Sequence, residues 1–424
     1  MVGSLHTTVR RTGVTALVGA LLLALLGLSG SAFAAPPGDV ASAGTGSSGS
    51  AAVGATGSVG ATVWAQRAVA SYDALQRYLY LGADQHKLYL ERYPFQDGDN
   101  AYSYLFPLRE ATAATIDVDV AKDSSRYDSD VRDRFDALGA YWNTEHVPPG
   151  YASYVVPPLG SGGDLFYDDN AIVGLEFVRN YLLTNQQSDR KRAEQIFDVL
   201  ASGWDTDTTH PCPGGMFWVD ATWTSIRAAN VTGLGTELAA HLYEITHQKS
   251  YLDWANKLYD WNRTCLRSPE GLYQNDISLD GTVNPTLWIY NSGAMIGAGA
   301  LLYRATGDRD YLVKAKADAT AALDYWTTDN RYFDQPAVFD AIFFKNLLLL
   351  DSVAHDPRYR PVVEAYAQHT WDSNRDPALG LFRFPPSGGG PYDPSYRPET
   401  LEQSAVIQTF ALLAWDTGDY RFAA

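Results

Sequence analysis

Asp168 and Asp169 are the residues of this chain best suited to chemistry, because they place two carboxylates side by side. Apolar residues at helical spacing follow them, so we expect the pair at a helix N-terminus. Two like charges this close raise the pKa of one group and leave the other ionised. The pair can therefore supply the acid and the carboxylate that glycoside hydrolysis uses, and adjacent residues suit the short separation of the retaining route.

Two other interpretations of the pair stay open. Asp and Asn are favoured at helix N-termini, where they cap free backbone N–H groups and interact well with the helix dipole. One acidic residue would satisfy that role, whereas here Asp168, Asp169 and Asn170 follow each other. Calcium binding by clustered carboxylates is the second alternative.

A repeat in the middle of the chain indicates the elements that carry this pair. Tyr181, Tyr243 and Tyr303 recur about every sixty residues, each near the end of an apolar-periodic run that a polar turn and a second run follow. In Thr306-Gly307-Asp308 the glycine suits a left-handed helix end and the aspartate suits the cap of the next helix. Each repeat is therefore a pair of antiparallel helices.

The periodicity predicts an all-α fold. Helices are expected at 62–81, 130–143, 168–184, 188–201, 222–246, 250–263, 290–306, 309–325, 338–354, 358–371 and 400–417. This set is one short of the twelve helices of an (α/α)6 barrel, and Thr115 to Val120 alternates briefly like a strand. Long loops at 143–167, 202–221, 264–289 and 373–399 precede the expected inner helices. Loops of such length in a compact domain are usually functional, and here they would gather at one end of the ring.

The first sixty residues differ in composition from the rest. Arg10 and Arg11 precede the apolar run Val14 to Leu28, and a small-residue cleavage site ends at Ala34. We therefore expect a signal peptide at 1–34, a Gly/Ser/Ala-rich flexible linker at 35–60 and one domain at 61–424. The apolar run is short for a membrane span, so we expect export without stable membrane insertion after cleavage. The mature protein would be extracellular, free or associated with the cell surface.

Composition narrows the range of partners. The net charge of −17 repels phosphate backbones, so nucleic acid is not expected. Aromatic residues make up 13% of the chain, with 27 Tyr and 11 Trp, and their flat faces suit sugar rings as well as helix packing. The histidines are scattered without a zinc motif, so no metal site is expected. Cys212 and Cys265 are equally compatible with one disulfide and with two buried thiols.

Several motifs, taken in order, resemble glycoside hydrolase family 76, the α-1,6-mannanases, over about residues 61 to 417. They are Tyr167-Asp168-Asp169-Asn170, Gly214-Gly215-Met216-Phe217-Trp218, Leu242-Tyr243 to Thr246 with Tyr251-Leu252, Trp288-Ile289-Tyr290-Asn291-Ser292-Gly293, Leu302-Tyr303 to Asp308, and Phe339-Asp340-Ala341-Ile342-Phe343-Phe344-Lys345. The chain departs from the family pattern at Ile172, Arg227 and Ser292.

This resemblance implies an (α/α)6 barrel and a retaining endo-α-1,6-mannanase that acts on α-mannan without a cofactor, with Asp168 as nucleophile and Asp169 as general acid/base. Candidates for contact with the sugar are Asn170, Trp218, Asp276, Tyr290 and Asn291. We expect a monomer. The alternatives are a cell-wall mannan transglycosylase and a catalytically silent mannan-binding barrel. An epimerase or uronide hydrolase would need a His pair or an Arg-rich pocket, which the sequence lacks.

Overall fold

The computed structural model describes residues 53–122, 125–385, 389–390 and 392–423. The expected signal peptide at 1–34 and the first part of the expected linker, residues 35–52, lie outside the described residues. The described chain from Val53 onward belongs to one compact unit.

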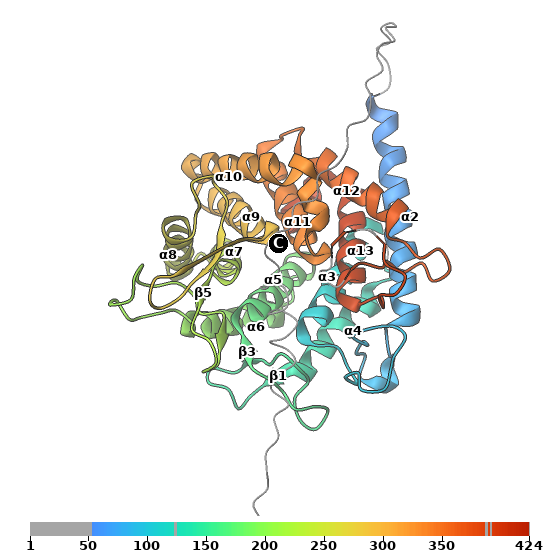
Figure 1. The fold of residues 1–424 in the computed structure, drawn as a ribbon, viewed down its shortest axis with the longest axis horizontal. Helices are drawn as coiled ribbons and strands as arrows, with labels where there is room; N and C mark the ends of the chain where they lie inside the picture. The colour runs from blue at the N-terminus through green and yellow to red at the C-terminus, as the bar shows by residue number, and fades with distance from the viewer. Residues whose placement is uncertain (1–52, 123–124, 386–388, 391, 424) are drawn as a thin grey trace, which may run out of the picture. The chain divides into compact units, whose positions relative to one another are not determined.

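Six helices form an inner ring, and each is buried along most of its length. They are α3 (Leu105–Lys122), α5 (Tyr167–Thr184), α7 (Ala229–Thr246), α9 (Ile289–Thr306), α11 (Ala337–Ala354) and α13 (Thr400–Ala414). Each inner helix packs against the next, and α13 packs against α3, so the ring is closed (Figure 1).

Six more helices surround this ring and bury one face each. They are α2 (Val53–Tyr78), α4 (Asp128–Leu138), α6 (Gln187–Ser202), α8 (Lys249–Cys265), α10 (Arg309–Thr327) and α12 (Tyr359–Ser373). Helices α4, α6, α8 and α10 pack on the inner helix that precedes them, and α2 packs on α13. The described chain is thus an (α/α)6 barrel, which confirms the predicted fold class.

Helix α3 is the twelfth helix that the periodicity missed. The prediction of a brief strand at Thr115 to Val120 was wrong, because these residues lie in the second half of α3. An inner helix is buried on all sides, so its polar residues do not mark a solvent face. Instead, the hydroxyls of Thr112 and Thr115 donate to carbonyls one turn earlier, at 2.9 and 2.7 Å, and Asp117 pairs with Arg179.

Two predicted boundaries also require correction. Helix α2 begins at Val53, so residues 53–60 are helical instead of part of a flexible linker. Extending an already packed helix costs little, since each added residue gains a backbone hydrogen bond. Helix α7 begins at Ala229 instead of at residue 222, because Arg227 and Ala228 form strand β5 first.

The inner helices all begin at the end of the barrel where the long loops gather. Short strands order these loops: β1 (Trp142–Asn143) pairs with β2 (Gly150–Tyr151), β3 (Leu165–Phe166) with β4 (Val219–Asp220), and β5 (Arg227–Ala228) with β6 (Gln274–Ile277), which pairs with β7 (Val283–Leu287). Strand β3 leads directly into α5 and strand β5 into α7 (Figure 1). These strands fix where the first turns of the two helices start.

The opposite end of the barrel holds short turns and the end of the described chain. Gly307 takes a left-handed conformation (φ 74°) after α9, and the Asp308 side chain accepts from the backbone N–H of Asp310, as the sequence predicted. The later echo at Thr417-Gly418-Asp419 forms a 3-10 helix, η4 (Thr417–Phe422). Arg179 of α5 donates to the Phe422 carbonyl at 3.0 Å, so η4 lies across this end of the ring.

Candidate active site

Asp168 occupies the first turn of α5, where β3 feeds the chain into the helix. Its Oδ2 accepts from the indole N–H of Trp218 at 2.9 Å and from the amide of Asn230 at 2.7 Å. Its Oδ1 accepts from the backbone N–H of Asp169 at 3.0 Å. Burial raises the pKa of the Asp168 carboxyl to about 6, although these hydrogen bonds lower it. Three donors aimed at one carboxylate favour its ionised form.

Asp169 is partly buried like Asp168 but sits in a different environment. Among the residues that the structure describes, no group donates a hydrogen bond to its carboxylate. Burial raises the pKa of Asp169 well above its usual range, and the negative charge of Asp168 raises it further. The two groups therefore differ, and Asp169 is the one that keeps its proton when the pair holds a single proton.

Asn170 completes the Asp-Asp-Asn sequence but turns away from the solvent. Its side chain is fully buried. It accepts from the Tyr151 N–H at 2.9 Å and donates to the carbonyls of Tyr151 and Phe166 at 2.9 and 2.8 Å. The predicted sugar contact is therefore not supported, because these backbone bonds occupy the amide. Asn170 instead fixes strand β2 and the start of α5.

Trp218, predicted as a sugar contact, donates its indole N–H to Asp168, and its stacking on a sugar stays a prediction. Tyr290 is the second residue of α9, as Asp168 is of α5. Its ring stacks on Phe339 with ring centroids 4.1 Å apart. Burial raises the pKa of the Tyr290 hydroxyl, and the nearby charges of Asp168 and Asp276 raise it further. Tyr290 is thus close enough to both carboxylates to interact with them.

Asp276 and Asn291 are more enclosed than expected. Asp276, in β6, is buried and accepts from the amides of Asn275 and Asn284 at 2.8 and 2.9 Å. Burial raises the pKa of this carboxyl, and the two amide bonds lower it. Asn291 follows Tyr290 and is fully buried, with no hydrogen-bond partner for its amide within the described chain. The structure thus brings Asp168, Asp169, Trp218 and Tyr290 together and sets Asn291 behind them.

Two residues that affect the pair were missed by the sequence analysis. Asn230 was overlooked because the predicted helix began at 222 and placed it in an interior turn, whereas it is the second residue of α7, as Asp168 is of α5. Arg109 lies in the missed helix α3 and donates to the carbonyl of Ile172 at 3.3 Å. Its positive charge lowers the pKa of Asp169. Correct helix boundaries would have found both residues.

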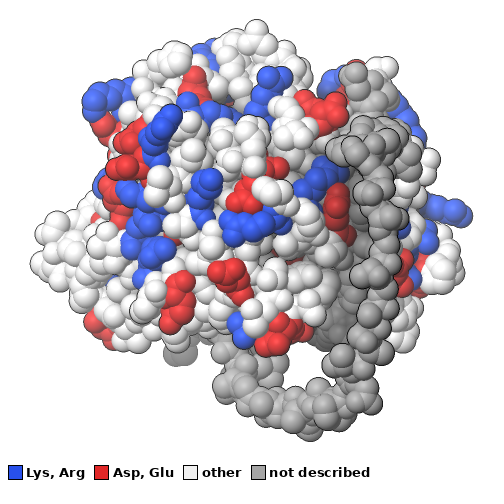
Figure 2. Space-filling model, turned by 90° about the horizontal axis from the view of Figure 1, so that it is seen from above, with Lys and Arg blue, Asp and Glu red and all other residues white. Residues whose placement is uncertain are grey.

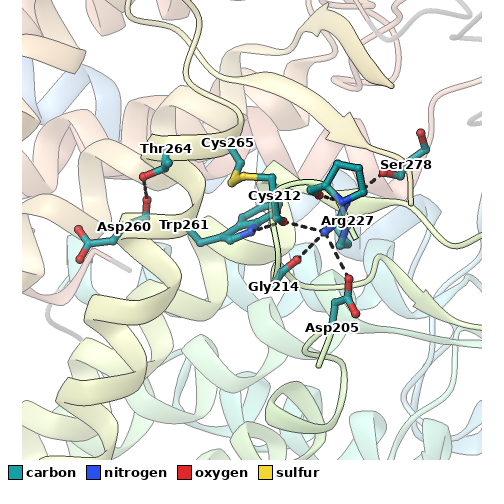
Figure 3. The surroundings of a disulfide bond; sticks show 10 residues. Asp205, Cys212, Gly214, Arg227, Asp260, Trp261, Thr264, Cys265 and Ser278 are labelled. Atoms are coloured by element: carbon teal, nitrogen blue, oxygen red, sulfur yellow. Dashed lines mark hydrogen bonds and ion pairs between the residues drawn. A yellow bond between two sulfur atoms is a disulfide. The ribbon is translucent and has the colours of Figure 1, made fainter. Parts of the chain in front are cut away.

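Arg227 and a disulfide hold together the loops that contain Cys212, Gly214 and Ser278 (Figure 3). The Arg227 guanidinium is buried and donates to the carbonyls of Pro211, Cys212, Gly214 and Ser278 at 2.8 to 3.0 Å. A lysine has three donors on one atom and would not reach this set, so arginine is required here. Cys212 and Cys265 form a disulfide, which decides between the two possibilities left open by the sequence.

We expect the disulfide to stabilise both the fold and the site. It closes a loop of 53 residues between the segment before Trp218 and the end of α8. Replacing both cysteines by serine should lower the free energy of unfolding by about 2 to 4 kcal/mol, because the unfolded chain gains freedom. Urea unfolding of the variant and of the wild type, each with and without reductant, measures this. A wild type that unfolds at the same urea concentration in reductant would contradict the prediction.

Among the described residues, neither the surface charge nor the arrangement of potential metal ligands indicates a nucleic-acid-binding site or a metal site. Figure 2 shows acidic and basic side chains interspersed on one face of the molecule, without a continuous basic stripe. In the described ranges no group of three or more His, Cys, Asp or Glu residues has the geometry of a metal site. None of the helices described is long and apolar enough to cross a membrane.

The fold and the acidic pair define an (α/α)6-barrel protein with two carboxylates at the loop end of one inner helix. The chain matches the sequence pattern of glycosyl hydrolase family 76 over residues 59–415 and belongs to this family. It is 27% identical over 215 residues to the mannan endo-1,6-α-mannosidase DCW1 of Candida glabrata, covering 47% of this chain and 44% of that protein. The match to the Saccharomyces cerevisiae protein of the same name is 31% identical over 167 residues, covering 35% and 36%. The matched segments span less than half the length of these relatives.

Solved structures share the fold. A family 76 glycoside hydrolase (mannosidase) from Bacteroides thetaiotaomicron superposes with a TM-score of 0.73 at 24% identity, covering 83% of this chain and 98% of that one. A second structure is an inactive variant of an α-1,6-mannanase from Salegentibacter, with two consecutive aspartates replaced by alanine, in complex with α-1,6-mannotetraose. It has a TM-score of 0.67 at 20% identity and covers 83% and 98% of the two chains.

Proposed function

We propose that this protein is an exported, retaining endo-α-1,6-mannanase. The observation that carries the proposal is the unequal environment of the acidic pair: Asp168 accepts three hydrogen bonds, whereas Asp169 accepts none in the described part of the chain. One ionised and one protonated carboxyl at the same pH is the division of labour that a retaining glycosidase needs. The Salegentibacter α-1,6-mannanase is inactive when two consecutive aspartates are replaced, which supports a catalytic role for an adjacent acidic pair.

The two carboxyls act in two steps. In the first, the Asp168 carboxylate bonds to the anomeric carbon while the glycosidic C–O bond breaks, and Asp169 gives its proton to the leaving oxygen. In the second, a water oxygen attacks the anomeric carbon, Asp169 takes a proton from that water, and the bond to Asp168 breaks. The configuration is inverted twice and is therefore retained in the product. Trp218 and Asn230 hold Asp168 in place through both steps.

Product analysis on defined mannans tests this function. We expect the purified protein to shorten α-1,6-mannan to oligosaccharides and to release products that carry the α-configuration at first, as seen by NMR. An α-1,2- or α-1,3-linked mannan without α-1,6 bonds serves as the control. Elongated acceptor sugars with little reducing sugar would instead identify a transglycosylase, and binding without any product would identify a silent barrel.

The pH dependence should report the Asp168 carboxyl. Asp168 must be ionised, so kcat/KM should rise as the pH increases through about 6, and it should fall at higher pH as Asp169 loses its proton. Replacing Asn230 by Ala removes a hydrogen bond that lowers the pKa of Asp168. The acid limb should therefore move to higher pH, by about one pH unit.

A matched variant controls for the loss of an amide. Asn284 donates its amide to Asp276 at 2.9 Å, much as Asn230 does to Asp168. Asn284→Ala should leave the acid limb where it is, even where it changes KM. An acid limb that stays in place in Asn230→Ala, or that moves in both variants, would show that the limb does not report Asp168.

A further inference from the structure

Trp223 is the one tryptophan among the strongly exposed large hydrophobic residues of the described chain, with 46% of its surface accessible. A single exposed apolar side chain is ordinary on a protein surface. This one differs because it is held by several contacts and packs on Trp218, the residue that donates to Asp168. It lies in the loop between β4 and β5, which continues from Trp218.

Three contacts fix the orientation of the Trp223 ring. Its indole N–H donates to Asp164 Oδ2 at 2.8 Å. Its ring packs edge to face on Trp218, with centroids 5.6 Å apart, and against Phe166 at 6.2 Å. The loop itself is closed by the backbone N–H of Trp218, which donates to the Ile226 carbonyl at 3.2 Å. A ring held in this way loses little conformational freedom when a ligand covers it.

The chemistry that Trp223 offers fits a sugar ring. Its N–H is already used, so the accessible part of the side chain is an apolar, electron-rich face, which matches the C–H face of a pyranose. Asp164 Oδ1 has no hydrogen-bond partner within the described part of the protein and can accept from a hydroxyl group of that sugar. A flat apolar face beside a free acceptor is the combination with which proteins bind carbohydrates.

We propose that Trp223 and Asp164 form a sugar-binding subsite for the polymer, outside the ring that Asp168 attacks. Trp218 lies between the two positions, because it packs on Trp223 and donates to Asp168. The subsite therefore takes a mannose unit beyond the reacting one and favours polymer over short substrates. This inference rests on the proposed function and specifies how that function selects its substrate.

Binding of α-1,6-mannotetraose to the Asp169→Asn protein tests the subsite. This background leaves Asp168, Trp218 and Trp223 with all their hydrogen bonds, since Asp169 accepts none in the described chain. Titration calorimetry should show that adding Trp223→Ala weakens binding about tenfold, as expected for a central aromatic contact. Trp223→Tyr, which keeps a flat ring, should retain most of the affinity.

Trp254 provides the matched control, because it is a partly exposed tryptophan on outer helix α8 that packs on Trp204. Trp254→Phe in the same background should bind the tetrasaccharide normally. A second measurement needs no substitution in the loop: the tetrasaccharide should protect Trp223, but not Trp254, from oxidation by N-bromosuccinimide, as mapped by mass spectrometry.

The outcomes separate the two hypotheses. If the Asp169→Asn protein binds no mannan oligosaccharide, the proposed function fails and the subsite fails with it. If it binds the tetrasaccharide but Trp223→Ala binds equally well and Trp223 is oxidised regardless of ligand, the subsite alone is overturned.

Discussion

Asp168→Asn should abolish hydrolysis of α-1,6-mannan, with a loss in kcat of about 10⁴-fold or more. An amide cannot form the covalent glycosyl intermediate, so no alternative residue replaces the first step. The fold should survive, because asparagine has the same shape and its oxygen can still accept from Trp218 and Asn230. Removing the negative charge also lowers the pKa of Asp169, because the charge of Asp168 raises it. Reducing-sugar release and thermal unfolding, measured on the same preparation, check both halves of this prediction.

Asp220→Asn is the control for this variant. Asp220 lies in β4, is exposed, contacts His146 at 2.7 Å and takes no part in the hydrogen bonds to Asp168. It should keep its activity. If Asp168→Asn turns over mannan at a rate near that of the wild type, Asp168 is not the nucleophile. An unfolded Asp168→Asn protein would instead show that the carboxylate serves the fold.

Asp169→Asn should also be inactive on mannan, with a loss of about 10²- to 10⁴-fold, but for a different reason. This variant lacks the proton donor for the leaving oxygen and the base for the water, while Asp168 still attacks. An aryl α-mannoside whose leaving group needs no proton should therefore form the intermediate, and the intermediate should accumulate as an initial burst of released phenol.

Rescue by azide distinguishes the role of Asp169 from that of Asp168. Azide is a small nucleophile that needs no base, so it should restore turnover of the aryl mannoside by Asp169→Asn and yield the α-mannosyl azide. The same addition to Asp168→Asn should give no α-product, because no glycosyl intermediate forms there. A β-mannosyl azide from Asp169→Asn would show that azide attacks the substrate directly, without a glycosyl intermediate. This is the result expected if Asp169 were the nucleophile, so it would exchange the roles of the two residues.

The acidic pair shows which features of the site could be predicted from the sequence. Its position at the head of α5 follows from the apolar spacing behind it and is found where expected. The environments of the two carboxylates could not be read in the same way. Trp218 and Asn230 come from segments 50 and 62 residues away, and only the packing of α5 against α7 brings them to Asp168. Asn170 was assigned to the sugar-binding site because it follows the pair in sequence, but its side chain is buried and bonded to backbone groups.

The sequence by itself determined the helical-hairpin repeat, the class of fold and the candidate acidic pair, because each depends on spacing along one chain segment. The tertiary structure decided what depends on burial from other segments. Helix α3 escaped detection because its buried polar residues, among them Thr112, Thr115 and Asp117, interrupt the apolar spacing that reveals the other inner helices. The disulfide, the four carbonyls around Arg227 and the exposed face of Trp223 arise where loops from different repeats meet. Patterns within one chain segment predict its helices, whereas a site built from several segments depends on how the closed ring brings their loops together.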